Sequence, residues 1–136
     1  MSSFNAKLLA VARQDPRYAY EAYEFIFQAL EHTQKMLGRP PTDEKADPNE
    51  PRNHVSGRQL AEGARAFALQ EFGMMARVVL RMWGINRTAD FGELVFNLIG
   101  AELMSKTNDD SRDDFHNIYD LDEALSNGFR IVLEEE

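Results

Sequence analysis

The densest cluster of potential metal ligands is the acidic segment at residues 108–114, which contains four aspartates and one arginine. Read as a twelve-residue calcium loop that begins at Asp109, the sequence would place further oxygen ligands at Ser111, Asp113 and Asp120. However, Asp114 stands where such a loop needs glycine for its sharp turn, and the last ligand would be an aspartate instead of a bidentate glutamate. We therefore expect a solvated turn here and no metal site.

The histidines and carboxylates give no catalytic pattern either. His32, His54 and His116 are far apart in the sequence and show no metal-ligand spacing. The chain has no cysteine, no glycine-rich phosphate loop, no G-x-S-x-G elbow and no H-E-x-x-H motif. Nothing in the spacing places two carboxylates in an apolar cleft, as acid–base catalysis would require. We predict no catalytic, cofactor-binding or metal-binding residues, and a small-molecule enzyme is the third of the functions that we consider.

Basic residues concentrate in the middle of the chain. Residues 58–87 carry a net charge of +3, whereas residues 1–57 carry −1 and residues 88–136 carry −10. The arginines of this middle segment are Arg58, Arg65, Arg77, Arg81 and Arg87. They could form a nucleic-acid-binding surface, or they could pair with local acids and cover apolar surface with their stems, which is the interpretation that we favour.

Composition and charge limit the classes of protein to which the chain can belong. With 136 residues, of which 43% are hydrophobic and 28% charged, the chain is long enough for one domain with a core. The net charge of −8 indicates a solvated acidic surface, or a basic partner for the acidic end. The absence of cysteine suits a reducing compartment, the N-terminal residues lack the pattern of a signal peptide, and no apolar stretch approaches the ~20 residues of a membrane helix. We expect a soluble cytoplasmic protein without membrane contact.

Two helices are predicted in residues 1–38. The first covers about residues 3–14, and the second covers residues 16–37, with Asp15 and Pro16 as its start signal and Gly38 as its end. In the second helix the polar side chains fall in an arc of about 100°, and aromatic and aliphatic side chains occupy most of the remainder. We favour a central helix packed on two sides, and the alternative is a helix that pairs with its copy in a homodimer through residues 18–37.

Residues 39–54 contain four prolines and no large apolar side chain, which predicts a linker or long loop. Beyond it, Ser56 and Gln59 have the spacing of a capping box, and Val55 and Leu60 have that of a hydrophobic staple. This start signal predicts a helix that ends at Gly73. A second helix covers residues 74–83 and ends at Gly84, and Trp83 is expected in the core. A third helix begins at Thr88 or Asp90 and buries an apolar face made of Phe91, Leu94, Val95, Leu98 and Ile99.

After the third helix the pattern changes to that of a small β-hairpin. Residues 103–107 and 115–119 read as two strands around the acidic turn, and Asp120 and Glu123 then start a short helix that ends at residues 127–128. Alternation over residues 129–133 predicts a terminal strand. The order of three helices and a hairpin is that of a winged helix. DNA binding by this face is not expected, because the third helix and the wing are acidic where phosphate contacts need basic residues.

Several segments of the chain resemble a family of conserved proteins from planctomycetes and verrucomicrobia. The matching segments are DPRY (15–18), YEAYEF (20–25), HVSG (54–57), WGI (83–85), TADFGELVFNLI (88–99), SKT (105–107) and DSRDDF (110–115). The resemblance covers most of the chain apart from the proline-rich linker and the last residues. It implies no activity and no functional residues, because no activity is assigned to that family.

The sequence therefore predicts one mainly α domain: an N-terminal helical pair (1–38), a linker (39–54) and a winged-helix-like unit with a small β-hairpin (55–136). The preferred function is a non-catalytic protein-interaction module, with a homodimer or a basic protein as the partner. The alternative is a nucleic-acid-binding protein that uses the arginines of the middle segment. No cofactor is expected.

Overall fold

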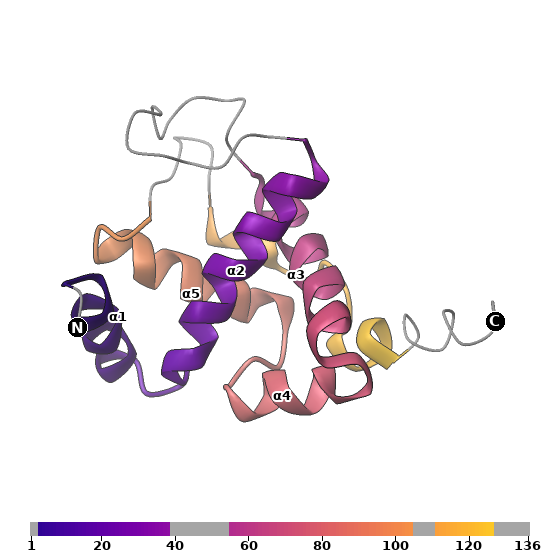
Figure 1. Ribbon diagram of the computed structural model, residues 1–136, viewed down its shortest axis with the longest axis horizontal. Helices are drawn as coiled ribbons and strands as arrows, with labels where there is room; N and C mark the ends of the chain where they lie inside the picture. Colours follow the sequence, from indigo (N-terminus) through magenta and orange to yellow (C-terminus); the bar gives the residue numbers. More distant parts are fainter. Residues whose placement is uncertain (1–2, 39–54, 105–110, 127–136) are drawn as a thin grey trace.

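The computed structural model describes residues 3–38, 55–104 and 111–126, and these residues form a helical fold without strands (Figure 1). Its α-helices are α1 (Ser3–Gln14), α2 (Tyr20–Met36), α3 (Gly57–Phe72), α4 (Ala76–Met82) and α5 (Thr88–Gly100). Two 3₁₀ turns, η2 (Gly73–Met75) and η3 (Arg112–Phe115), lie before α4 and after α5. None of the described helices is long and apolar enough to cross a membrane. The prediction of a mainly α protein is confirmed.

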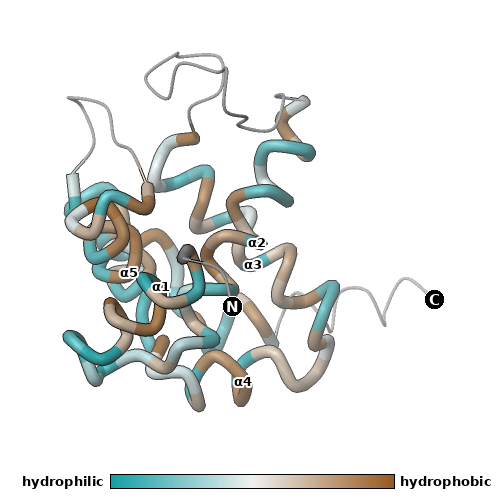
Figure 2. The backbone as a smooth tube through the Cα atoms, turned by 60° about the vertical axis from the view of Figure 1, so that its left-hand side comes forward, coloured by the Kyte–Doolittle hydropathy of each residue, from teal (hydrophilic) through white to brown (hydrophobic). Residues whose placement is uncertain are grey.

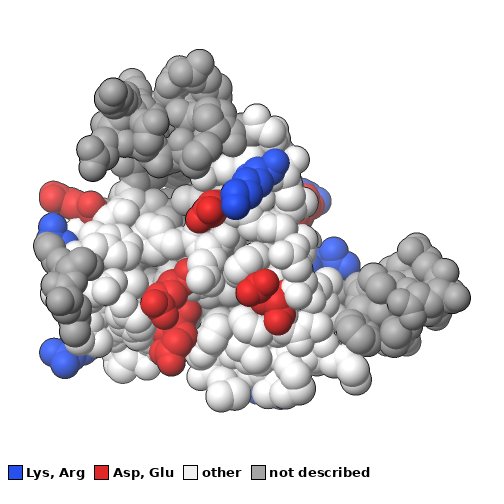
Figure 3. All heavy atoms as spheres, viewed as in Figure 1, with Lys and Arg blue, Asp and Glu red and all other residues white. Residues whose placement is uncertain are grey.

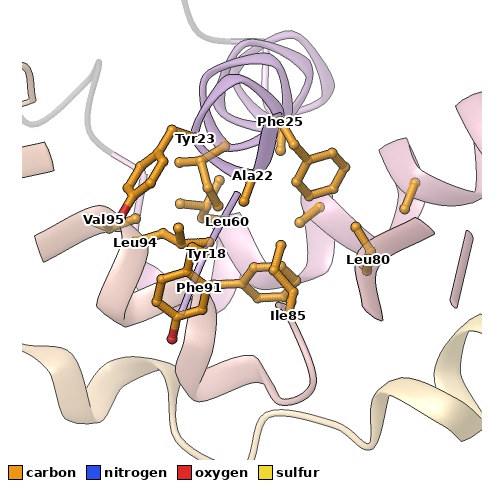
Figure 4. Packing of buried hydrophobic residues seen from close by; sticks show 14 of the residues in the cluster. Tyr18, Ala22, Tyr23, Phe25, Leu60, Leu80, Ile85, Phe91, Leu94 and Val95 are labelled. Atoms are coloured by element: carbon orange, nitrogen blue, oxygen red, sulfur yellow. The ribbon is translucent and has the colours of Figure 1, made fainter. Parts of the chain in front are cut away.

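Helix α2 lies at the centre of the fold, where it contacts α1, α3 and α5. Its side chains Tyr23, Phe25 and Ile26 are almost completely buried. Figure 4 shows side chains of α2, α3, α4 and α5 converging in one apolar cluster, and buried residues of α1 belong to the same cluster. These contacts explain the broad apolar surface of the α2 sequence, and the interpretation as a helix packed on two sides is confirmed.

The start of α2 differs from the prediction. We expected Asp15 and Pro16 to open this helix, but it begins at Tyr20, and the residues between α1 and α2 form a turn. The reason is that the Asp15 carboxylate accepts hydrogen bonds from the backbone N–H of Arg17 at 3.3 Å and from its Nε at 2.9 Å, which closes a local turn. The N–H of Ala19 donates to the carbonyl of Trp83 at 3.1 Å, which holds this turn against the end of α4.

The start signal after the linker is confirmed. The N–H of Ser56 donates to Gln59 Oε1 at 2.9 Å, and the N–H of Gln59 donates to Ser56 Oγ at 3.1 Å, which is the reciprocal pair of a capping box. The structure has α3, α4 and α5 in the predicted order with short turns between them. Trp83, which we expected in the core, is partly buried and packs against the rings of Phe25 and Phe72.

The predicted β-hairpin is wrong in the residues that the structure describes. The returning strand was expected at residues 115–119, but Phe115 ends the 3₁₀ turn η3, and Asn117 adopts a left-handed conformation with φ of 52°. In the first strand, residues 103–104 form a bend, and residues 105–107 lie outside the described residues. The winged-helix interpretation therefore has no wing in the described part of the chain.

Local hydrogen bonds explain why a turn replaces the strand. Ser111 and Asp114 cap the start of η3, where the hydroxyl of Ser111 accepts from the N–H of Asp113 at 3.2 Å. Within the expected strand, the N–H of His116 donates to the carbonyl of Asp113 at 3.1 Å, and the N–H of Ile118 donates to Thr88 Oγ1 of α5 at 3.2 Å. These backbone donors are therefore satisfied without a partner strand. Phe115 alone is buried in this segment, whereas a strand would bury every second side chain.

The short helix after this turn is present. Residues 121–126 are helical, and the carboxylate of Asp120 accepts from the N–H of Glu123 at 2.9 Å, as the predicted cap requires. The expected helix end at residues 127–128, the expected strand at residues 129–133 and the linker at residues 39–54 lie outside the described residues.

Candidate functional site

A buried hydrogen bond joins the turn before α2 to the first turn of α5. The hydroxyl of Tyr18 donates to Asp90 Oδ1 at 2.6 Å, and both residues are buried. The other carboxylate oxygen of Asp90 accepts from the N–H groups of Asn86 and Arg87 at 2.8 and 3.0 Å. Burial and the bond to Asp90 raise the pKa of Tyr18 well above its usual value, so the hydroxyl remains a donor. Because both oxygens of Asp90 are engaged, the pair positions the turn and leaves no free base.

Charged side chains of alternating sign continue this connection at the surface. Arg17 bridges Asp15 at 2.7 Å and Glu93 at 3.2 Å, and the other Glu93 oxygen lies 3.2 Å from Arg112. Asn97 donates to Asp15 at 2.8 Å. The hydrogen bonds from Arg17, assisted by the one from Asn97, hold the pKa of Asp15 at about 2, below its ordinary 3.8. The network ties the turn before α2, helix α5 and η3 together.

Replacing Asp15 with asparagine should reduce the loss of stability at acid pH. A carboxylate whose pKa is lower in the folded state stabilises the fold above its unfolded pKa of 3.8, and this contribution disappears as the pH falls toward the folded pKa of about 2. From about pH 5 to pH 2 we expect the wild type to lose about 1 kcal/mol more unfolding free energy than Asp15→Asn, as measured by urea denaturation.

The control for this measurement is Glu62→Gln, which removes an exposed ion pair to Arg58 on α3. This variant should show the same pH dependence as the wild type, because such exposed pairs contribute little to stability. If Asp15→Asn and the wild type lost equal free energy at acid pH, the assigned role of Asp15 would be wrong.

A groove of about 660 Å³ lies beside this network. Three segments that are far apart in the sequence form its wall: Arg17 from the turn before α2, residues 86–89 with Glu93 at the start of α5, and residues 116–117 with residues 119–121 after η3. The wall is polar, with guanidinium, amide, imidazole and carboxylate groups. We call this feature the polar groove.

The arginines of the middle segment mostly have partners within the chain. Arg77 and Arg81 both lie beside Asp122, Arg77 in direct contact and Arg81 at 3.7 Å. Arg77 is also largely buried, and its Nη1 donates to the carbonyl of Ile85 at 3.2 Å. Two further pairs are Arg58 with Glu62 at 3.5 Å and Arg65 with the carbonyl of Ala124 at 3.1 Å. These contacts match the interpretation that the arginines pair with nearby acceptors.

Four large apolar side chains of η2 and α4 are exposed within residues 74–82. The exposed fractions are 76% for Met74, 55% for Met75, 40% for Val78 and 74% for Met82. Their spacing in a continuous helical segment places them on one face. Figure 2 shows α4 as a hydrophobic segment at the edge of the molecule, and on the face drawn in Figure 3 this edge carries few charged side chains. We call these four residues the methionine surface.

Two of the three histidines lie in the described part of the chain. His32 is partly buried beside the ring of Phe67, His116 is exposed at 3.6 Å from Asp113, and His54 lies outside the described residues. Within the described part of the chain no group of three or more histidine, aspartate or glutamate side chains is arranged to hold a metal ion. Asp109, where a calcium loop would begin, also lies outside that part.

Sequence reasoning missed both the methionine surface and the polar groove. A signal for the first was available, because residues 74, 75, 78 and 82 form a second apolar face on a helix whose buried residues are Ala76 and Leu80. No comparable signal exists for the groove, because its three segments meet only in the folded chain. Two of the segments that carry the family resemblance, 15–18 and 88–99, contribute residues to its wall.

Comparison with known proteins gives no relative to guide the assignment. No family model matches the chain, and neither a curated protein nor a solved structure matches it. The resemblance to the planctomycete and verrucomicrobial family therefore stays a prediction. The assignment of function depends on the geometry of the two surfaces.

Proposed function

We propose that the protein is a non-catalytic protein-interaction module that binds the apolar face of an amphipathic helix through the methionine surface. The observation that carries the proposal is the exposure of four large apolar side chains on one face of η2 and α4. Burying such a side chain is worth about 1.5–3 kcal/mol relative to leaving it in water. Clustered exposed apolar side chains are therefore typical of surfaces that are covered by a partner.

The dimensions of the methionine surface suit a single helix. Met74 and Met82 are eight residues apart, which corresponds to roughly 12 Å along a helical segment. A partner helix of two to three turns presents apolar side chains at positions i, i+3 or i+4, and i+7 over a similar length. Three of the four side chains are methionines, whose flexible thioethers adapt to the shape of a partner.

Charge at the border of the surface indicates which partner helix would fit. Arg81 is adjacent to Met82, and its side chain is 58% exposed. Its contact with Asp122 is long at 3.7 Å, and Asp122 is already in direct contact with Arg77. An acidic residue beside the apolar anchors of the partner would therefore gain a charge-assisted contact with Arg81.

A second copy of the chain is the weaker alternative occupant. A stable dimer buries about 800 Å² on each partner, which is more than four partly exposed side chains supply. The homodimer that we expected through residues 18–37 has less support, because the apolar side chains of α2 contact α1, α3 and α5 within the chain. The basic partner expected for residues 108–114 stays a prediction, since part of that segment lies outside the described residues.

The other functions considered have less support than protein interaction. Nucleic-acid binding would need free arginines, and most of those in the middle segment are paired within the chain. An enzyme would need a free acid or base in an enclosed site, and Asp90 and Tyr18 are bound to each other. A cytoplasmic location, supported by the absence of cysteine, remains part of the proposal.

The double variant Met74→Gln with Met82→Gln should lose binding to an amphipathic helix. The probe is a labelled peptide of about 16 residues with leucines at i, i+3, i+4 and i+7 and glutamates beside them, and binding is measured by fluorescence anisotropy. Glutamine has nearly the length of methionine and a good helix propensity, so the fold should be preserved. We expect the affinity to fall at least tenfold, because two apolar contacts are lost.

Met36→Gln is the matched control, since Met36 is 59% exposed but lies at the end of α2, outside the methionine surface. It should bind the peptide like the wild type. Binding of equal strength by the double variant, or no binding of the peptide to the wild type, would count against the proposal. A wild-type dimer in sedimentation experiments that the double variant does not form would assign the surface to a second copy.

A further inference from the structure

We infer that the polar groove binds a small molecule that carries an oxyanion, a carboxylate or a phosphate, next to Arg87. The groove belongs to a different part of the molecule from the methionine surface, and the inference is independent of the proposed interaction with a helix. It rests on the pairing of charges in the groove, on the way its wall is fixed and on its volume.

Of the charged side chains in the wall of the groove, Arg17 and Glu93 are paired with opposite charges. Arg17 contacts both Asp15 and Glu93, and Glu93 is bound from its other side by Arg112. Together these four side chains contribute no net charge. The carboxylate of Asp120 accepts from the backbone N–H of Glu123 but has no ion pair among the described residues, so a ligand anion must bind on the Arg87 side of the groove, away from this carboxylate.

Within the described part of the chain, Arg87 is the unpaired cation of the groove wall. Its backbone N–H is bound to Asp90, but among the described residues its guanidinium has no hydrogen bond and no ion pair. The side chain is exposed and lines the groove together with the amide side chains of Asn86 and Asn117. A guanidinium with its donors free in a concave polar wall is a binding group for a carboxylate or phosphate, which it can contact through two parallel hydrogen bonds.

The segment that closes the groove on one side is fixed in place. Phe115 is buried, and there is room for it only because residues 57 and 92 are glycines: a Cβ at Gly92 would lie 2.9 Å from the Phe115 ring. The N–H of Ile118 donates to Thr88 Oγ1 at 3.2 Å. Because the wall is held on both sides of residues 116–117, a ligand would not have to order it, and little binding free energy would be lost to that step.

The volume and chemistry of the groove set the size and kind of ligand. About 660 Å³ lies within the range of sites for metabolite-sized molecules, and it is far more than a single phosphate or carboxylate occupies. The side-chain amide of Asn117 can donate to or accept from hydroxyl and amide groups of the same molecule. The amide of Asn86 is already bound within the chain, since its Oδ1 accepts from Arg77 at 3.3 Å and its Nδ2 donates to the carbonyl of Gly84 at 3.4 Å. A metabolite with one oxyanion and several hydroxyl or amide groups fits this wall.

The test is a titration of the ¹⁵N-labelled full chain with sodium phosphate and, separately, with sodium citrate, at constant ionic strength kept with sodium chloride. Chemical shifts of the Arg87 Nε–H and of the Asn117 side-chain amide are followed by NMR. We expect saturable shifts at these two groups with one of the two anions. Arg87→Gln should weaken binding at least tenfold, because a charge-assisted contact is lost.

Asn117→Asp provides a second variant, since aspartate also tolerates the left-handed conformation at this position and adds a repelling charge to the wall. It should weaken binding as well. Arg58→Gln is the matched control, because Arg58 is an exposed arginine on α3 outside the groove, and it should bind like the wild type. Saturation by phosphate alone or by citrate alone identifies the oxyanion. Shifts that grow linearly, or equal affinity in Arg87→Gln and the wild type, would overturn the inference.

Discussion

Replacing Gly84 with alanine should destabilise the protein by about 4 kcal/mol or more. Two separate penalties act at this position. The backbone of Gly84 has φ of +94°, which side chains with a Cβ rarely adopt, and a Cβ there would lie 2.0 Å from the carbonyl oxygen of Arg17. The obstacle is backbone, so it cannot rotate away. The variant must move the turn before α2 away from the end of α4, which breaks the bond from Ala19 to Trp83.

Two other glycines, Gly38 and Gly100, allow the two penalties to be separated. The free energy of unfolding of each variant is measured by urea denaturation, with circular dichroism as the signal. Gly38 has φ of +69°, and an added Cβ would meet no atom within 4 Å, so Gly38→Ala should cost only about 1 kcal/mol. Gly100 has neither a positive φ nor a close neighbour, so Gly100→Ala should be neutral or slightly stabilising. If Gly84→Ala were no worse than Gly38→Ala, the close contact with Arg17 would not exist in solution.

The position of Gly84 also explains how the turn before α2 is coupled to the polar groove. Arg17 lines the groove, and its carbonyl oxygen lies against Gly84. A shift of this turn would move Arg17 away from Glu93 as well as from Gly84. Gly84→Ala should therefore disturb the groove and the fold together.

Local sequence signals predicted the helices well because the interactions that start and end them are local. The capping box of Ser56 and Gln59 and the glycines after α3 and α4 act within a few residues, so they are visible in the sequence. Asp15 and Pro16 show the limit of this reasoning. They have the pattern of a helix start, but the Asp15 carboxylate is used by Arg17 and by Asn97 of α5, and the helix begins later.

The prediction of a β-hairpin was wrong for a related reason. A strand needs a partner, and two apolar segments around an acidic turn do not show whether the backbone donors are satisfied by a neighbouring strand or locally. Here the N–H of His116 is bound by the carbonyl of Asp113 and the N–H of Ile118 by the hydroxyl of Thr88. The candidate sites divide in the same way: the methionine surface follows from spacing within one helical segment, whereas the polar groove depends on three segments whose meeting the sequence does not reveal.

The second large effect is expected at Gly63, in the interior of α3, where alanine would normally stabilise a helix by about 1 kcal/mol. Here we expect Gly63→Ala to destabilise the protein by about 3 kcal/mol. A Cβ at this position would lie 1.8 Å from Thr33 Oγ1 and 2.8 Å from Thr33 Cβ, and Thr33 is buried in α2. The hydroxyl already donates to the carbonyl of Ala29 at 2.7 Å. The two helices would have to separate at this contact, which loosens the core between α2 and α3.

A double-mutant cycle decides whether this steric contact is the cause. Thr33→Ala alone should cost about 1 kcal/mol, because it removes one buried hydrogen bond. In the double variant the Oγ1 and Cγ2 atoms are gone and only the milder contact with Cβ remains, so the combined loss should be smaller than the sum of the single losses by at least 1 kcal/mol. Additive losses would mean that Gly63 is required for another reason. Rescue by Thr33→Ala would establish that α3 carries glycine at this position so that it can approach Thr33 of α2.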